Sequence, residues 1–295
     1  MATLIPRHVK DALGTAVKAL EAVESDRAAG RGDVIVARLD GRAFHTFVHV
    51  AHCAKPFDDA LTAAMIETAR QLVEEQGARV AYVQSDEISL LFPPPAGERG
   101  EHPFGGRYQK LASTLASAAT AYLSLACRVC GVPVPSHVVA TFDCRVFATD
   151  RAGATAAFAW RELDCVTNAV SSVARHVLGH AAMHKKGTAA LLAAVAAADV
   201  DFSAYPAANR SGTYVRRCAT LCALDDETVA DIPVAHRPTE PFMRNLVVTR
   251  AGEGAARGLL HRAANAEAVL FDGAAPVEGS PPCLAAAEGA AAADI

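Results

Sequence analysis

The stretches VIVARLDGR (residues 34–42) and VAYVQSDEISLLF (residues 80–92) decide the fold of this chain. Both are apolar runs rich in β-branched residues, a composition that favours β-strands. The second is interrupted by a short polar turn, so it predicts two strands, Val80–Val83 and Ile88–Phe92, joined by a tight hairpin. One acidic residue, Asp40, follows the first strand, and another, Asp86, lies in the hairpin turn. The pattern therefore predicts a sheet whose strand ends carry carboxylates.

Helical patterns alternate with these strands. Pro56 opens a run whose apolar residues recur at helical spacing, and a second such run covers about residues 107–130. A fourth strand is predicted at His137–Phe142, which Arg145–Ala148 can continue as a fifth, and a long helix at Ala154–Leu178. The order β-α-β-β-α-β predicts an α+β, ferredoxin-like (split βαβ) fold, with an antiparallel sheet and the helices on one face.

The periodicity weakens beyond about residue 180. Ala189–Ala198 predicts a short helix, and Gly212–Val215 and Asn245–Val248 are candidate strands. We therefore expect three parts along the chain. They are a main α+β domain (residues 1–180), a helix and strand extension packed on it (residues 181–250) and a peripheral Ala-rich tail (residues 251–295).

Length and composition limit the classes of function. The 295-residue chain can bury a sizeable core, and its net charge of −4 means that any contact with RNA must come from a local basic patch. The sequence has no apolar run of about 18 residues and no signal-peptide pattern, so we expect a cytoplasmic protein without membrane contact. Four cysteines lie in apolar stretches (Cys127, Cys130, Cys218 and Cys222), where packing as small apolar groups is favoured over a zinc site.

The two acidic segments have the chemistry of a metal site. In a sheet of this order the first and third strands are central neighbours, so Asp40 and Asp86 should project at the same edge. Two nearby carboxylates repel unless divalent cations lie between them, and Mg²⁺ binds carboxylates, water and phosphates. Two such ions can activate an attacking hydroxyl and stabilise a leaving pyrophosphate. Gly41, without a Cβ, would let phosphate approach the main chain, whose N–H groups from Arg42 to His45 can cradle an anion.

A simpler interpretation of each segment stands beside this one. Asp-Gly after a strand is a common turn, and Ser-Asp-Glu is a common hairpin tip. The spacing alone leaves both the structural turns and the metal site open.

A series of segments between about residues 34 and 217 resembles, in order, those of the tRNA-His guanylyltransferase family. The matching segments are Arg38–His45, Lys55–Asp58, Tyr82–Glu87, Phe104–Ser113, Phe142–Arg145, Trp160–Asn168 and Arg210–Thr213. The chain is most similar to the family's bacterial and archaeal Thg1-like branch.

The resemblance implies a polymerase-like palm that adds nucleotides to the 5′ end of a tRNA in the 3′-to-5′ direction. It implies two Mg²⁺ ions per site, GTP and ATP as substrates, tRNA as partner, and a homo-oligomer, by resemblance a tetramer. It implies Asp40, Asp86 and Glu87 as catalytic residues, and Asp40, Gly41 and Asp86 as metal ligands. The implied nucleotide-binding residues are Asp40, Gly41, Arg42, Ala43, Phe44, His45, Lys55, Asp58, Ser85, Asp86, Arg107, Lys110 and Asn168.

One departure from the family pattern bears on the reaction. Guanylyltransferases proper carry His-Ile-Asn-Asn where this chain has Val166-Thr167-Asn168-Ala169. This favours template-dependent repair of 5′-truncated tRNAs over addition of the −1 G to tRNA-His, which is the alternative. A nucleotide cyclase is disfavoured by the Trp160–Asn168 segment. A palm-like RNA-binding protein without catalysis is disfavoured because both acidic segments are retained.

Several other residues invite a simple interpretation. His45, His49 and His52 are expected to be surface or core residues in place of metal ligands, and Trp160, the only tryptophan, to lie in the core. Three arginines, Arg210, Arg216 and Arg217, fit either an RNA-facing patch or a solvated strand edge.

Overall fold

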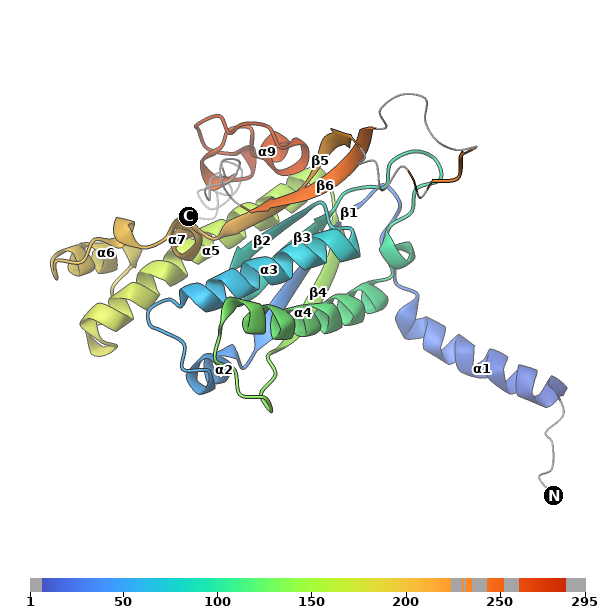
Figure 1. Cartoon of the computed structure of the whole chain (residues 1–295), viewed down its shortest axis with the longest axis horizontal. Coiled ribbons are helices and arrows are strands. Elements are labelled where there is room, and N and C mark those ends of the chain that lie inside the picture. Colours follow the sequence, from blue (N-terminus) through green and yellow to red (C-terminus); the bar gives the residue numbers. More distant parts are fainter. Residues whose placement is uncertain (1–6, 224–229, 231, 235–242, 252–259, 285–295) are drawn as a thin grey trace, which may run out of the picture.

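The computed structural model of the chain describes residues 7–223, 230, 232–234, 243–251 and 260–284 (Figure 1). Its centre is a six-stranded sheet in the order β4-β1-β3-β2-β5-β6, in which every neighbouring pair of strands is antiparallel. The strands are β1 (Val34–Arg42), β2 (Val80–Gln84), β3 (Glu87–Phe92), β4 (Thr141–Thr149), β5 (Thr213–Ala223) and β6 (Met243–Ala251). The first four have the spatial order of a split βαβ unit, so the predicted ferredoxin-like sheet is confirmed.

Helices pack around this sheet. The described α-helices are α1 (Arg7–Ser25), α2 (Phe44–Val50), α3 (Asp59–Gln76), α4 (Tyr108–Cys130), α5 (Arg151–Leu178), α6 (Thr188–Ala196), α7 (Ala207–Ser211) and α9 (Ala266–Asp272). Short 3-10 turns lie at Pro103–Gly106, Ala181–Met183, Phe202–Ala204 and Leu260–Arg262. Helix α1 projects from the body of the protein (Figure 1). No helix within the described ranges is long and apolar enough to span a membrane.

The helices cover both faces of the sheet, so the expectation that they share one face is wrong for α5. Helices α3 and α4 pack on the face that carries Ile35, Ala37 and Leu39, whereas α5 packs on the opposite face with Val34 and Val36. The reason lies in β1, whose first four residues are all buried, with apolar side chains pointing to both faces. Such a strand needs cover on both sides.

The fourth strand is a single element where two short strands were proposed. It pairs with β1 without a break from Thr141 to Thr149. The intervening Asp143-Cys144 pair continues the alternation, because Cys144 and Val146 pack against the core while Asp143 and Arg145 are exposed. No turn residue interrupts the run, so one strand forms.

The C-terminal region contributes to the fold more than a peripheral tail would. Strands β5 and β6 extend the sheet beyond β2, and α9 packs on the α5 side. The buried side chains of this region are Leu260, Ala263, Ala266, Val269, Leu270 and Phe271. The carboxylate of Glu162 on α5, fully buried, accepts hydrogen bonds from the Tyr214 hydroxyl and from the main-chain N–H groups of Leu260 and His261. Residues 252–259 and 285–295 of the predicted tail lie outside the described residues.

Candidate active site

The two acidic segments meet at the same end of the central strands β1 and β3, as predicted. We call this end of the sheet the acidic edge. Asp40 lies near the end of β1, opposite Glu87 of β3 on one side and Asp143 of β4 on the other. The main-chain N–H of Gly41 donates to the carbonyl oxygen of Asp86 at 3.1 Å. The hairpin turn is therefore held directly against the end of β1, and both carboxylates belong to one site.

Gly41 is required at this edge by the space around it. A Cβ at this position would overlap the ring of Phe44 and lie 3.0 Å from the Cβ of Asp86. Phe44 is the first residue of α2 and is buried in the core, so its ring cannot swing into solvent. Glycine thus permits the close approach of β1, α2 and the hairpin turn.

We predict that Gly41→Ala destabilises the protein by about 1–3 kcal/mol, the range for overpacking a core. The added methyl group must displace either Phe44 or Asp86, so nucleotide affinity should fall as well. Urea unfolding measures the free energy. Gly32→Ala is the control, because nothing lies within 4 Å of that Cβ. Equal stability of the two variants would contradict the close approach.

The negatively charged form of the Asp86 carboxylate is disfavoured when no cation is bound beside it. Ser85, at a positive φ of 48°, donates from its hydroxyl to Asp86 Oδ1 at 3.0 Å. Burial, followed by the negative charges of Asp40 and Glu87, nevertheless raises the pKa of Asp86. A bound cation would remove this cost, so the site has the electrostatics that a divalent ion compensates.

The donor set fits Mg²⁺ only together with a substrate. Within the described part of the chain, no three His, Cys, Asp or Glu side chains form a ready-made metal cluster. The predicted ligands are two carboxylates and the Gly41 carbonyl, which leaves positions for water and phosphate oxygens. Mg²⁺ is commonly held in this way, by one or two carboxylates plus substrate phosphates.

Glu87 is engaged in a buried ion pair and is best described as a positioning residue. Its Oε1 accepts from Arg161 Nε at 2.7 Å and from Gln84 Nε2 at 3.0 Å. Arg161 also donates to Asp164 at 2.6 Å, and Asn168 donates to the same Asp164 oxygen. This chain of contacts fixes the hairpin to α5 and so sets the position of Asp86.

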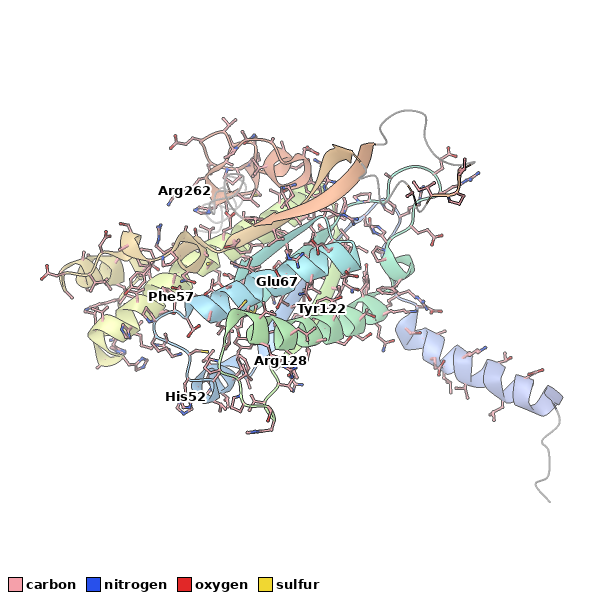
Figure 2. All side chains as sticks on the ribbon, viewed as in Figure 1. His52, Phe57, Glu67, Tyr122, Arg128 and Arg262 are labelled. Atoms are coloured by element: carbon pink, nitrogen blue, oxygen red, sulfur yellow. The ribbon has the colours of Figure 1, made fainter. Side chains whose placement is uncertain are left out.

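A cleft of about 640 Å³ opens beside the acidic edge, a volume in the range of small-molecule sites. Of the predicted site residues, it is lined by Asp40, Phe44, His45, Lys55, Asp58, Ser85, Asp86, Glu87 and Asn168. Phe57, labelled in Figure 2, also lines it, next to the start of α3. Most of the predicted site is therefore gathered around one cavity.

Asp58 shapes the cleft wall through its hydrogen bonds. Its carboxylate accepts from the main-chain N–H groups of Leu61 at 2.9 Å and Ala54 at 2.8 Å. It therefore caps α3, which begins at Asp59 and not at Pro56 as the sequence suggested.

Two residues that were predicted to contact the nucleotide, Arg107 and Lys110, lie at the opposite ends of the strands from Asp40. Arg107 forms a β-bridge with Ala28, which precedes β1, and Lys110 lies near the start of α4. Strand β3 runs away from Asp86, so the helix that follows it begins at the far edge. Within one chain these two residues do not reach the cleft. Gly41, Arg42 and Ala43 stand at the edge itself but do not line the cavity.

Of the α5 residues that line the cleft, sequence reasoning named only Asn168. Arg161, Cys165, Asn168, Ser172 and Arg175 all line it. Their spacing of four, three, four and three residues is that of one helix face, so the polar stripe was present in the sequence. Residues 165–198 also contain no acidic residue, which leaves this wall cationic through Arg175.

Trp160 is the other error, because it lies on the surface and not in the core. Its side chain is 54% exposed. Arg161, the next residue, is buried instead, because its guanidinium finds the carboxylates of Glu87 and Asp164.

Comparison with known proteins points to the family that the sequence segments resemble. The family described as tRNAHis guanylyltransferase matches residues 15–150. An uncharacterized protein of Acanthamoeba polyphaga mimivirus is 28% identical over 165 residues, which are 49% of this chain and 56% of that protein. The human probable tRNA(His) guanylyltransferase is 42% identical over 59 residues, 20% of each chain. The match thus spans 56% of the mimivirus protein and only 20% of the human one.

Solved structures share the fold over a larger part of the chain. A bacterial tRNA(His) guanylyltransferase (Thg1)-like protein in complex with ATP superposes with a TM-score of 0.65 at 28% identity, covering 69% of this chain and 88% of that one. The same kind of protein in complex with GTP gives a TM-score of 0.57. The Saccharomyces cerevisiae tRNA(His) guanylyltransferase, 19% identical, shares the fold with a TM-score of 0.58 over 70% of this chain and 95% of that one. The family match over residues 15–150, together with the shared palm-like fold, shows that this chain is similar to the tRNAHis guanylyltransferase family.

Proposed function

We propose that this chain is a Mg²⁺-dependent nucleotidyltransferase that adds nucleotides to the 5′ end of tRNA and repairs truncated 5′ ends. The observation that carries the proposal is the pairing of Asp40 and Asp86 at the mouth of the 640 Å³ cleft. The proposed partners are tRNA and nucleoside triphosphates, met in the cytoplasm. A homo-tetramer, which light scattering would detect, is the proposed assembly.

The chain's own residues divide the work of such a reaction. Asp40, Asp86 and the Gly41 carbonyl would hold two Mg²⁺ ions, which supply charge neutralisation and an activated hydroxyl when bound. The main chain at the start of α2 offers N–H groups to phosphate oxygens, while Lys55 and Arg175 give the cleft its positive charge. Bacterial relatives solved with ATP and with GTP support a triphosphate in this cleft.

Sequence around residue 166 supports repair over addition of a −1 G. The Val166–Ala169 segment lacks the histidine of guanylyltransferases proper, and in this chain Asn168 is committed to Asp164 at 3.1 Å. Held in this way, Asn168 helps to shape the cleft. Other residues must then select the RNA.

The test compares RNA substrates. The protein is incubated with Mg²⁺, labelled GTP or ATP, several tRNAs lacking their first nucleotide, and intact tRNA-His. Extension of many truncated tRNAs, each with the nucleotide that pairs with the template base, is expected. Addition only to tRNA-His would establish the alternative, and no incorporation into any RNA would refute the proposed activity.

Arg175 provides a prediction for the wall of the cleft that α5 forms. Arg175→Ala should raise the KM for the nucleoside triphosphate about ten-fold, roughly the effect of one lost charge-assisted contact, with a smaller change in kcat. Steady-state kinetics with varied GTP separates the two. Arg128→Ala is the control, because Arg128 is exposed near the end of α4 and does not line the cleft (Figure 2). An unchanged KM would remove Arg175 from the nucleotide site.

A further inference from the structure

Trp160 belongs to an exposed aromatic surface on the outer side of α5. Trp160 is 54% exposed, and two further large apolar residues on these elements are also exposed, Phe147 of β4 at 42% and Leu163 of α5 at 38%. Phe147 and Arg145 point to the α5 face of the sheet, because Cys144 and Val146 pack on the other face. The surface therefore spans the outer strand and the helix beside it.

Guanidinium groups accompany the aromatic rings. The guanidinium carbon of Arg161 lies 4.3 Å from the Trp160 ring centre, and that of Arg38 lies 5.7 Å from it. Arg145, more than half exposed, places its Nη2 3.9 Å from Asp40 Oδ2. Aromatic rings interleaved with guanidinium groups are the combination that binds unpaired nucleotides, by stacking on the base and pairing with the phosphate. We call Trp160, Arg38 and Arg145 the Trp160 platform.

The Trp160 platform and the cleft lie on different sides of Asp40. Strand β1 runs between β3 and β4, and the cleft is lined by the β2–β3 hairpin on the β3 side. None of the three platform residues lines the cleft, and Arg145 approaches Asp40 from the β4 side. A nucleotidyl transfer needs two reactants at one point in line with each other. When a triphosphate occupies the cleft, the second reactant can approach Asp40 from the β4 side.

We propose that the Trp160 platform binds the 5′-terminal nucleotide of the RNA substrate by stacking its base on Trp160 and pairing its phosphate with the exposed Arg145, while Arg38, held near Glu87, supports the Trp160 ring. This inference rests on the proposed function and adds to it the place of the RNA end. Stacking on an aromatic side chain tolerates any base, because each base has a flat face. The platform thus suits an enzyme that extends ends of different sequence.

The only tryptophan of the chain makes the platform directly observable. Titration with a 5′-phosphorylated RNA hairpin that lacks its first nucleotide should quench the Trp160 emission, whereas the same hairpin without its 5′ phosphate should quench it less at equal concentration. Trp160→Ala should weaken binding of the fluorescein-labelled hairpin, measured by anisotropy, about ten-fold or more. Trp160→Phe, which keeps an aromatic face, should recover most of the affinity.

Controls separate the platform from simpler roles. Val129→Ala, at an exposed apolar residue of α4 that is not part of this surface, should leave RNA affinity within about two-fold, and ATP affinity should be unchanged in all three variants. Loss of ATP binding or of thermal stability in Trp160→Ala, equal to the loss of RNA binding, would mean that Trp160 only covers the Arg161–Glu87 pair. Unquenched emission at saturating RNA would also refute the platform.

The same measurements distinguish failure of the platform from failure of the proposed function. A wild-type protein that extends RNA without quenching or loss of affinity in Trp160→Ala refutes the platform alone. A wild-type protein that binds the hairpin with quenching but incorporates no nucleotide refutes the proposed reaction and leaves the RNA site standing.

Discussion

Asp86→Asn is expected to abolish nucleotide addition, by a factor on the order of 1,000 or more, while making the free protein more resistant to heat. The loss follows because a neutral amide cannot replace a carboxylate as a ligand of a divalent ion. The gain follows from the raised pKa of Asp86, since its charged form is disfavoured by burial and by the neighbouring Asp40 and Glu87.

The sign of the stability effect can be worked out from that pKa. A carboxyl group whose folded-state pKa lies above its unfolded-state pKa contributes stability at low pH, and the contribution is lost as pH rises through the folded-state pKa. At neutral pH Asp86 therefore costs stability that asparagine does not. Melting curves without metal should show Asp86→Asn above the wild type, and the difference should shrink as pH falls. Mg²⁺ added together with GTP should raise the wild-type Tm more than the Asp86→Asn Tm.

A matched control is available on an exposed loop. Asp199 lies after α6 at a positive φ of 59°, a conformation that asparagine also adopts. Asp199→Asn should leave both activity and Tm unchanged. A fully active Asp86→Asn protein would contradict the metal site, and a lower Tm would contradict the electrostatic account of the edge.

The second large effect is expected at Arg161. Arg161→Met leaves the buried Glu87 carboxylate without its main partner, and breaking a buried ion pair on one side typically costs about 3–5 kcal/mol. Both side chains are only 11% exposed, so water cannot readily replace the lost contact. Nucleotide addition should fall too, because Glu87 and Asp86 are adjacent in the hairpin that Arg161 holds.

Arg70 on α3 supplies the contrast for this prediction. It pairs with Glu67 and Glu74 at similarly short distances, but its side chain is 39% exposed (Glu67 is labelled in Figure 2). Exposed pairs of this kind contribute about 0–1 kcal/mol, so Arg70→Met should cost little. Urea unfolding of both variants is the measurement. Equal costs would show that Glu87 does not depend on the buried pair.

The acidic edge could be predicted because it depends on local pattern. Strand alternation around Asp40 and the hairpin at Asp86 fix both carboxylates to strand ends, and the split βαβ order brings those ends together. No long-range packing decision intervenes between the two segments and the site. Gly41 was expected from the sequence for phosphate access, whereas its packing against Phe44 and Asp86 became evident only in the structure.

The wall of the cleft that α5 forms could not be predicted, because it depends on which face of the sheet α5 covers. Helical periodicity in α5 shows that it has an apolar face but not which side of the sheet that face covers. The exposure of Trp160 and the burial of Arg161 both follow from that choice. Resemblance likewise carried Arg107 and Lys110 toward the site by their order in the chain, although the direction of β3 places them at the far edge.

Transfer of a 5′-labelled nucleotide onto truncated tRNA tests the central claim most directly. With [α-³²P]GTP, unlabelled ATP to activate the 5′ phosphate, Mg²⁺ and a 5′-phosphorylated tRNA that lacks its first nucleotide opposite a template C, the account predicts label at the RNA 5′ end with wild-type protein and none with Asp86→Asn. Label at the 3′ end, or equal labelling by both proteins, would contradict the assignment of this edge to 5′-end nucleotide addition.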